Sequence, residues 1–129
     1  MDKVKSSFDT YDFGVNKVGS IFLGKDIVVD GPDNQERKRR IRVQTHAHSD
    51  HTRNWIDHIR PGKALVTTEP TREILSLENP HLRRNGNVHV VGHGDTINIA
   101  NLIDTNNAMR KIDLNDSSVT LYDANHMLG

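Results

Sequence analysis

A chain of 129 residues with 17 basic and 17 acidic side chains is small enough for one domain and carries no net charge, which favours neither nucleic acid nor a membrane surface as partner. The absence of cysteine excludes disulfides and thiolate metal sites, and leaves His, Asp and Glu as the strong ligands. No apolar run approaches the roughly 18 residues of a membrane span, and residues 1–7 lack the apolar core of a signal peptide. We therefore expect a soluble cytoplasmic protein without a membrane partner.

The first predicted element is a β-hairpin within residues 11–30. Residues 18–23 are strand-like, residues 24–26 supply a turn, and residues 27–29 form a short β-branched strand. Asp30 ends this strand, at the start of a run of turn residues. It is either a turn-forming Asp or a carboxylate that accepts a hydrogen bond from the free N–H of a metal-bound histidine.

A basic run follows at residues 36–42, with five positive charges against one negative. Such a run is usually a solvated loop, but its position directly before the histidine-rich segment also favours a phosphate-binding surface. No aromatic residue is interleaved with it, so base stacking is not indicated. The candidate nucleic-acid-binding residues are Arg37, Lys38, Arg39 and Arg40.

Residues 41–45 alternate apolar and polar, as in a half-buried strand, and lead into the segment Thr45-His46-Ala47-His48-Ser49-Asp50-His51-Thr52. Imidazole and carboxylate are the ordinary ligands of zinc and similar metals. Residues two apart share a face only on an extended or looped backbone, so His46, His48 and Asp50 converge only if no helix forms here. His51 is out of phase with them and would face a neighbouring point, such as a second metal.

The remaining elements alternate between helix and strand. Residues 52–60 predict a helix with a stripe of Trp55, Ile56 and Ile59, and we place His58 on its surface rather than in a metal site. Residues 64–68 predict a buried strand, and a helix follows with Thr68 as its N-cap. Further strands are predicted at residues 88–91, 96–103 and 119–123, with an exposed loop over residues 104–116. This order is typical of a layered α+β domain.

Two segments together resemble the metallo-β-lactamase superfamily, in its β-CASP branch of nucleases for RNA 3′-end processing and DNA cross-link repair. The first is the His-x-His-x-Asp-His block at residues 46–51. The second is the tripeptide Ala124-Asn125-His126, followed by Gly129. Weaker matches lie at residues 27–31, like the superfamily's early strand ending in Asp, and at residues 68–72.

The resemblance implies the N-terminal half of an αββα sandwich, with residues 1–129 forming a partial domain that lacks the second half and the β-CASP insertion. His46, His48 and His126 would hold one zinc ion, while Asp50 and His51 would begin the second of two zinc sites and act in catalysis. At most one site would be well formed in this chain. A half-sandwich would expose an apolar sheet face, so a homo-oligomer that covers it is also expected.

The implied activity of the complete protein is zinc-assisted hydrolysis of phosphodiester bonds in RNA or single-stranded DNA, with little or none expected of residues 1–129 alone. The alternative is another hydrolase of the superfamily, acting on a small-molecule ester, thioester or lactam. The segment at Asn125-His126 argues against it, because those branches usually carry a Pro-Gly-His pattern there. A non-catalytic metal-binding or scaffold subunit is a third possibility.

Overall fold

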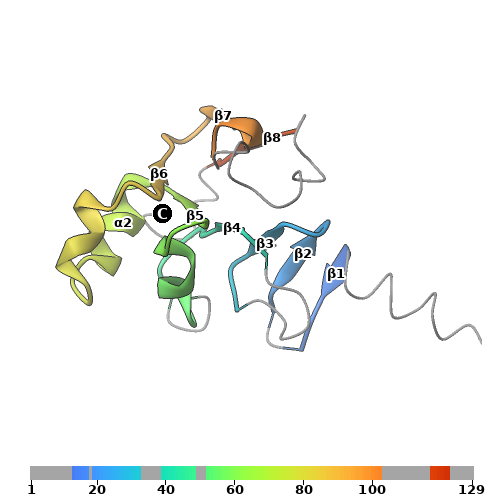
Figure 1. The fold of residues 1–129 in the computed structure, drawn as a ribbon, viewed down its shortest axis with the longest axis horizontal. Helices are drawn as coiled ribbons and strands as arrows, with labels where there is room; N and C mark the ends of the chain where they lie inside the picture. The colour runs from blue at the N-terminus through green and yellow to red at the C-terminus, as the bar shows by residue number, and fades with distance from the viewer. Residues whose placement is uncertain (1–12, 18, 33–38, 49–51, 103–116, 123–129) are drawn as a thin grey trace, which may run out of the picture.

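Six short strands form one mixed sheet, in which they lie in the same order as in the chain (Figure 1). The computed structural model describes residues 13–17, 19–32, 39–48, 52–102 and 117–122. β2 pairs antiparallel with both β1 and β3, whereas β3 to β6 run parallel to one another, so the carboxyl ends of β3 to β6 lie at one edge of the sheet. The strands are β1 (Phe13–Val15), β2 (Ile21–Leu23), β3 (Ile27–Val29), β4 (Ile41–Val43), β5 (Ala64–Thr67) and β6 (Val88–Val90).

Helices cover one face of this sheet. They are the 3-10 helix η2 (Trp55–Ile59), the α-helix α2 (Glu69–Leu75) and the 3-10 helix η3 (Pro80–Arg84). Pro70 stands in the first turn of α2, where its missing N–H costs nothing, as the sequence predicts for a helix that begins after Thr68. The apolar contact is made by a helix-side cluster of Trp55, Leu65, Leu75 and Leu82.

The opposite face of the sheet carries a second, two-stranded antiparallel sheet of β7 (Thr96–Asn98) and β8 (Ser118–Thr120), with the 3-10 helix η4 (Ile99–Asn101) beside it. Because β5 is buried on both faces, its residues alternate between the two interiors, as period-2 geometry requires. The described residues therefore form a layered α+β structure, as predicted. The sheet-side cluster consists of Ile27, Ile41, Val43, Ala64, Val66, Val91, Ile99, Leu102 and Leu121.

Most predicted elements are present, and the main differences lie in the hairpin, in one helix and in one strand. The hairpin of β2 and β3 is confirmed, but it gains a third strand, β1, that the sequence did not predict. The predicted helix at residues 52–60 is the short 3-10 helix η2, and the predicted strand at residues 96–103 ends at Asn98, where η4 follows. The loop predicted at residues 104–116 lies outside the described residues. Among those described, no helix has the length and apolar character needed to cross a membrane.

The apolar face of the large sheet continues beyond the small sheet that covers part of it. Phe13 of β1 lies opposite Leu23 of β2, and Val15 lies opposite Ile21. Leu23 and Ile21 in turn lie opposite residues of β3 that pack in or against the sheet-side cluster. All four side chains are exposed; Val15, the most open, has 68% of its surface accessible. An exposed apolar face was expected from the sequence, and its covering by a second copy stays a prediction.

His58 corrects a prediction, because it is buried in η2 rather than placed on a helix surface. Its Nε2 lies 3.0 Å from the carbonyl oxygen of Arg39, which can only accept, so Nε2 carries the proton. Nδ1 is buried without a hydrogen-bond partner among the described residues. Burial, aided by the charges of Arg42 and Lys63, lowers the pKa of His58 from 6.5 to about 4, against the opposing effects of the Arg39 carbonyl and Asp57.

The buried neutral His58 predicts a loss of stability in mild acid. The unfolded chain takes up a proton at this residue below pH 6.5, whereas the folded chain does so only near pH 4. The contribution of His58 to the free energy of unfolding is therefore highest above pH 6.5. It falls by up to about 3 kcal/mol as the pH is lowered toward 4. Urea unfolding of the parent and of His58→Gln, whose amide can still donate to Arg39, measures this difference. Equal pH dependence of the two proteins would contradict it.

Candidate metal centre

His46 and His48 lie side by side in an irregular segment that leaves the carboxyl end of β4. Residues 44–48 form neither helix nor strand, which confirms the predicted extended or looped backbone. The two imidazole rings meet edge to face, with 4.8 Å between their centroids. His46 is partly buried and His48 is exposed, so one ring is held by the protein while the other faces solvent.

Asp30 stands directly behind these histidines, at the end of the neighbouring parallel strand β3. Its backbone N–H donates to the carbonyl of Val43 at 3.0 Å, which places the ends of β3 and β4 together. The residue adopts a left-handed conformation with φ of 53°, which Asp tolerates better than most side chains. Its carboxylate accepts two hydrogen bonds from Thr45, one from the backbone N–H at 2.7 Å and one from the hydroxyl.

The hydroxyl of Thr45 connects Asp30 to His46. It lies 2.7 Å from Nδ1 of His46, whereas the Asp30 carboxylate itself is 3.8 Å from that nitrogen. A hydroxyl has one proton, and here it is donated to the carboxylate, so the hydroxyl oxygen accepts from an Nδ1–H. The lone pair of His46 is then on Nε2, the form in which an imidazole binds metal. Asp30 is thus a strand-end residue with a left-handed backbone, and its carboxylate accepts from Thr45 rather than directly from the ring N–H, as the sequence interpretation had it.

Gly31 allows Asp30 to occupy this position, because the chain after β3 passes close to Ser20. A Cβ on Gly31 would lie 2.8 Å from the Cβ and 3.0 Å from the Cα of Ser20. These are backbone-proximal atoms that cannot rotate away, so a methyl group here forces the two segments apart.

We expect Gly31→Ala to destabilise the fold by about 1–3 kcal/mol, the usual cost of overpacking. Ser20→Gly removes both the hydroxyl and the Cβ, so the double variant should recover most of the lost stability. Urea midpoints of the two single variants and the double variant measure this. Additive losses, with no recovery, would show that Ser20 is not the obstacle.

The basic run before β4 is anchored inside the protein where the structure describes it. Arg39 is fully buried; its Nε donates to the carbonyl of Gly24 at 3.1 Å, and its guanidinium lies over the ring of Phe22 at 4.2 Å. Arg40 is mostly buried, and its Nε is 3.0 Å from the carboxylate of buried Asp26. The solvated-loop interpretation is therefore wrong for these two residues, whose side chains bind the turn between β2 and β3. Burial also leaves Arg39 no surface with which to contact a phosphate, while the phosphate contact of Arg40 stays a prediction.

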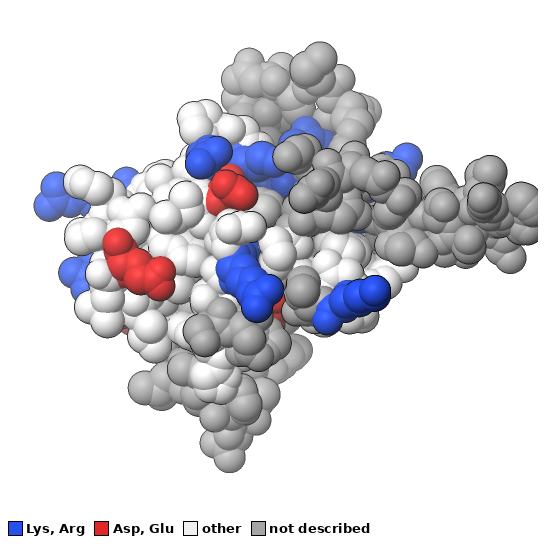
Figure 2. Space-filling model, turned by 90° about the horizontal axis from the view of Figure 1, so that it is seen from below, with Lys and Arg blue, Asp and Glu red and all other residues white. Residues whose placement is uncertain are grey.

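Charged side chains elsewhere do not gather into one basic surface on the face that Figure 2 shows. Lys and Arg appear there in separate groups, with Asp and Glu side chains between them. This agrees with the zero net charge of the chain. The candidate phosphate-binding residues Arg37 and Lys38 lie outside the described residues, and their role stays a prediction.

The remaining candidate ligands also lie outside the described residues: Asp50, His51 and His126. Within the described ranges no group of three or more His, Cys, Asp or Glu side chains is arranged to hold a metal ion. The structure thus brings together one pair of the predicted ligands, His46 and His48, with Asp30 behind the first. The sequence did not predict the role of Thr45, because its pattern identifies it only as the last residue of an alternating strand.

Comparisons with known proteins add no relative, since no family model, no curated protein and no solved structure matches the chain.

The link through Thr45 predicts different effects for two substitutions. Thr45→Val keeps the shape but removes the hydroxyl, so Nδ1 of His46 loses its acceptor; zinc affinity should fall by about ten- to a hundredfold. Thr45→Ser keeps the hydroxyl and should bind zinc nearly as the parent does. Ring ¹⁵N chemical shifts report the His46 tautomer and zinc titration the affinity. An unchanged Nδ1–H tautomer in Thr45→Val would refute the role of the hydroxyl.

Proposed function

We propose that His46 and His48 are zinc ligands of a hydrolase that cleaves phosphodiester bonds in RNA or single-stranded DNA, and that His126 completes their site. Asp50 and His51 would begin a second zinc site and take part in catalysis. The observation that carries the proposal is the adjacent pair of imidazoles at the carboxyl edge of the sheet, one of them hydrogen-bonded at Nδ1. The likeness of the His-x-His-x-Asp-His block to the β-CASP nucleases supports the choice of substrate.

The donor set suits zinc rather than a harder ion. Two neutral imidazoles are borderline-soft ligands, and the chain has no cysteine to compete with them. Zinc bound at such a site lowers the pKa of its water to about 7 and polarises a phosphoryl oxygen. The contribution of Asp30 and Thr45 is to hold the ring of His46 in one tautomer and one orientation.

The proposal extends to the architecture. We propose that the six-stranded sheet, with helices on one face and a small sheet on the other, is the N-terminal half of an αββα sandwich. The helix-side and sheet-side clusters on opposite faces of the large sheet support this. In the resembling family the bridging carboxylate and the last histidine of the second site follow the third histidine, so we expect hydrolysis only where these further ligands are also supplied.

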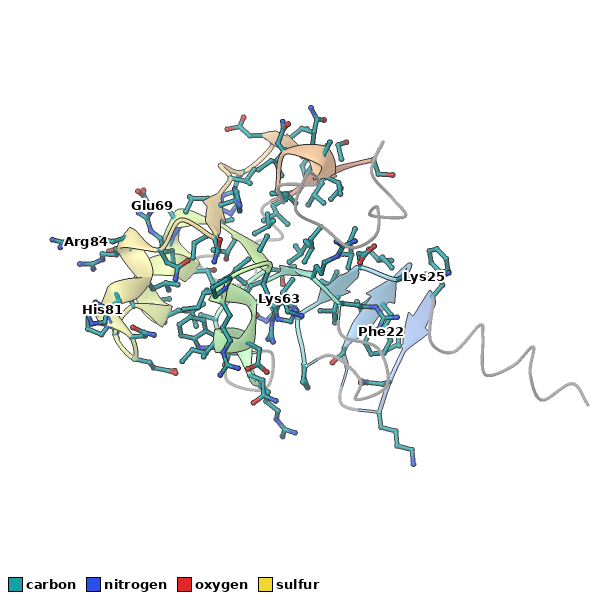
Figure 3. The ribbon with its side chains drawn as sticks, in the orientation of Figure 1. Phe22, Lys25, Lys63, Glu69, His81 and Arg84 are labelled. Carbon is teal, nitrogen blue, oxygen red and sulfur yellow. The ribbon has the colours of Figure 1, made fainter. Side chains whose placement is uncertain are left out.

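Metal binding by the present chain is the first test. We expect about one zinc ion per chain by elemental analysis, and a near-complete loss in His46→Ala because two ligands would remain of three. His81→Ala is the matched control, since His81 is an exposed histidine on η3, at the outer end of the helical layer (Figure 3). Equal zinc content in the parent and His46→Ala would mean that the segment is not a metal site.

Substrate class is the second test, made on the zinc-loaded protein at its full natural length. We expect cleavage of labelled RNA or single-stranded DNA and no turnover of a generic thioester or lactam, because the proposed site acts on phosphoryl oxygens. His46→Ala in the same protein should abolish the cleavage. Turnover of the thioester or lactam without nuclease activity would instead support the small-molecule hydrolase, and zinc binding without either activity would support a non-catalytic subunit.

A further inference from the structure

Arg42 is a second fully buried arginine, and it lies in the middle of β4, directly before the histidine segment. Its neighbours in the sheet are Val28 on β3 and Leu65 on β5. Leu65 belongs to the helix-side cluster, so Arg42 points toward the helical layer while Ile41 and Val43 pack in the sheet-side cluster. An apolar residue would fill this position without the cost of removing a guanidinium from water.

Gln44 and Arg53 are partners of the Arg42 guanidinium among the described residues. Its Nε donates to the side-chain oxygen of Gln44 at 2.9 Å, and one terminal nitrogen donates to the backbone carbonyl of Arg53 at 2.6 Å. Gln44, also fully buried, donates from its own amide nitrogen to the backbone carbonyl of His46 at 2.8 Å. This Arg42–Gln44 link therefore joins the backbone at His46 to the backbone at Arg53.

These two carbonyls lie on either side of the candidate ligand segment. The first attachment is at His46 itself and His48 follows it, and the 3-10 helix η2 begins shortly after the second attachment. Gln44 is itself fixed to β5, because its N–H donates to the carbonyl of Val66 and its carbonyl accepts from the hydroxyl of Thr67 at 2.8 Å. The link thus runs from a rigid central strand to both sides of the segment.

Arg42 stays charged although it is buried. Burial lowers the pKa of Arg42 from its ordinary value to about 10, and the nearby charges of Asp30 and Asp57 act in the opposite direction. The guanidinium is thus still charged at neutral pH and makes charge-assisted hydrogen bonds, which are stronger than those of neutral groups. A planar fork that donates in two directions also suits two acceptors at fixed positions better than a lysine ammonium does.

We propose that Arg42 is a positioning residue for the zinc ligands: through Gln44 and Arg53 it fixes both sides of their segment, so that His46 and His48 are already paired before metal binds. The inference rests on the proposed function in that it takes these two histidines as ligands. Preorganised ligands spare the ordering cost that a mobile segment incurs on binding. The metal affinity of the chain therefore depends on a side chain that does not touch the metal.

Arg42→Lys tests this, with Arg39→Lys as the matched control. Both arginines are fully buried, but the guanidinium of Arg39 bonds Gly24 and lies over Phe22, which Figure 3 shows on the β1–β2–β3 part of the sheet. Both substitutions keep the charge and shorten the reach, so both should lower stability. We expect only Arg42→Lys to weaken Co²⁺ binding, by about ten- to a hundredfold, the usual effect of losing a group that orients a ligand.

Co²⁺ titration gives two readouts besides folding, the affinity and the intensity of the d–d absorption bands. Arg42→Lys should change both under conditions where urea unfolding shows that it and Arg39→Lys are fully folded. Gln44→Met serves if Arg42→Lys does not fold, because it breaks the attachment at His46 and keeps the side-chain volume. Parent-like affinity and spectrum in the variant, or an equal loss in Arg39→Lys, would overturn the proposal.

Failure of the proposed function gives a different result. If the parent chain binds no Co²⁺, the histidines are not ligands, and the positioning effect is then measured by amide hydrogen exchange. Exchange at His46–His48 should be at least tenfold faster in Arg42→Lys than in Arg39→Lys if the link holds this segment. Equal exchange in the two variants would refute the positioning role independently of metal.

Discussion

The hydrogen bonds between Asp30 and Thr45 fix the point at which the sheet ends and the histidine segment begins. They join residues 15 apart in the chain, and they form because β3 and β4 run parallel and finish at the same edge. A slip of one residue in this register would turn Thr45 to the opposite face and separate it from the carboxylate. The orientation of His46 is therefore a property of strand pairing as much as of its own side chain.

Buried polar groups, rather than exposed charge, characterise the region around the histidines. Arg39 and Arg42 are both fully buried, and each donates to a backbone carbonyl that would otherwise need another partner. Removing one side of such a pair leaves a buried charge or carbonyl unsatisfied, which costs far more than the pair contributes. The basic run thus includes residues that fasten β4 to the turn after β2 and to the start of η2.

The sequence predicted those features that depend on short-range pattern. The strand after residue 26, the strand at β5 and the helix start after Thr68 follow from β-branched runs, turn residues and capping preferences. β1 was missed because it is three residues long and contains Gly14, so only its pairing with β2 defines it. The burial of His58 depends on the Arg39 carbonyl, 19 residues away, and no local pattern encodes that contact. The same holds for Thr45, whose hydroxyl matters only once Asp30 stands beside it.

β5 divides the molecule into two apolar interiors, with Leu65 on the helical side and Val66 on the side of the small sheet. Among the described residues no buried side chain belongs to both clusters, so the two interiors meet only through the backbone of the sheet between them. The histidine segment is held from each side separately: Thr67 and Asp30 contact residues 44 and 45 at the sheet edge, and the Arg53 attachment lies on the helical side. Substitutions in the helical layer near Arg53 can therefore alter one of the two supports of His46 and His48 while the hydrogen bonds of Asp30 and Thr67 at the sheet edge remain.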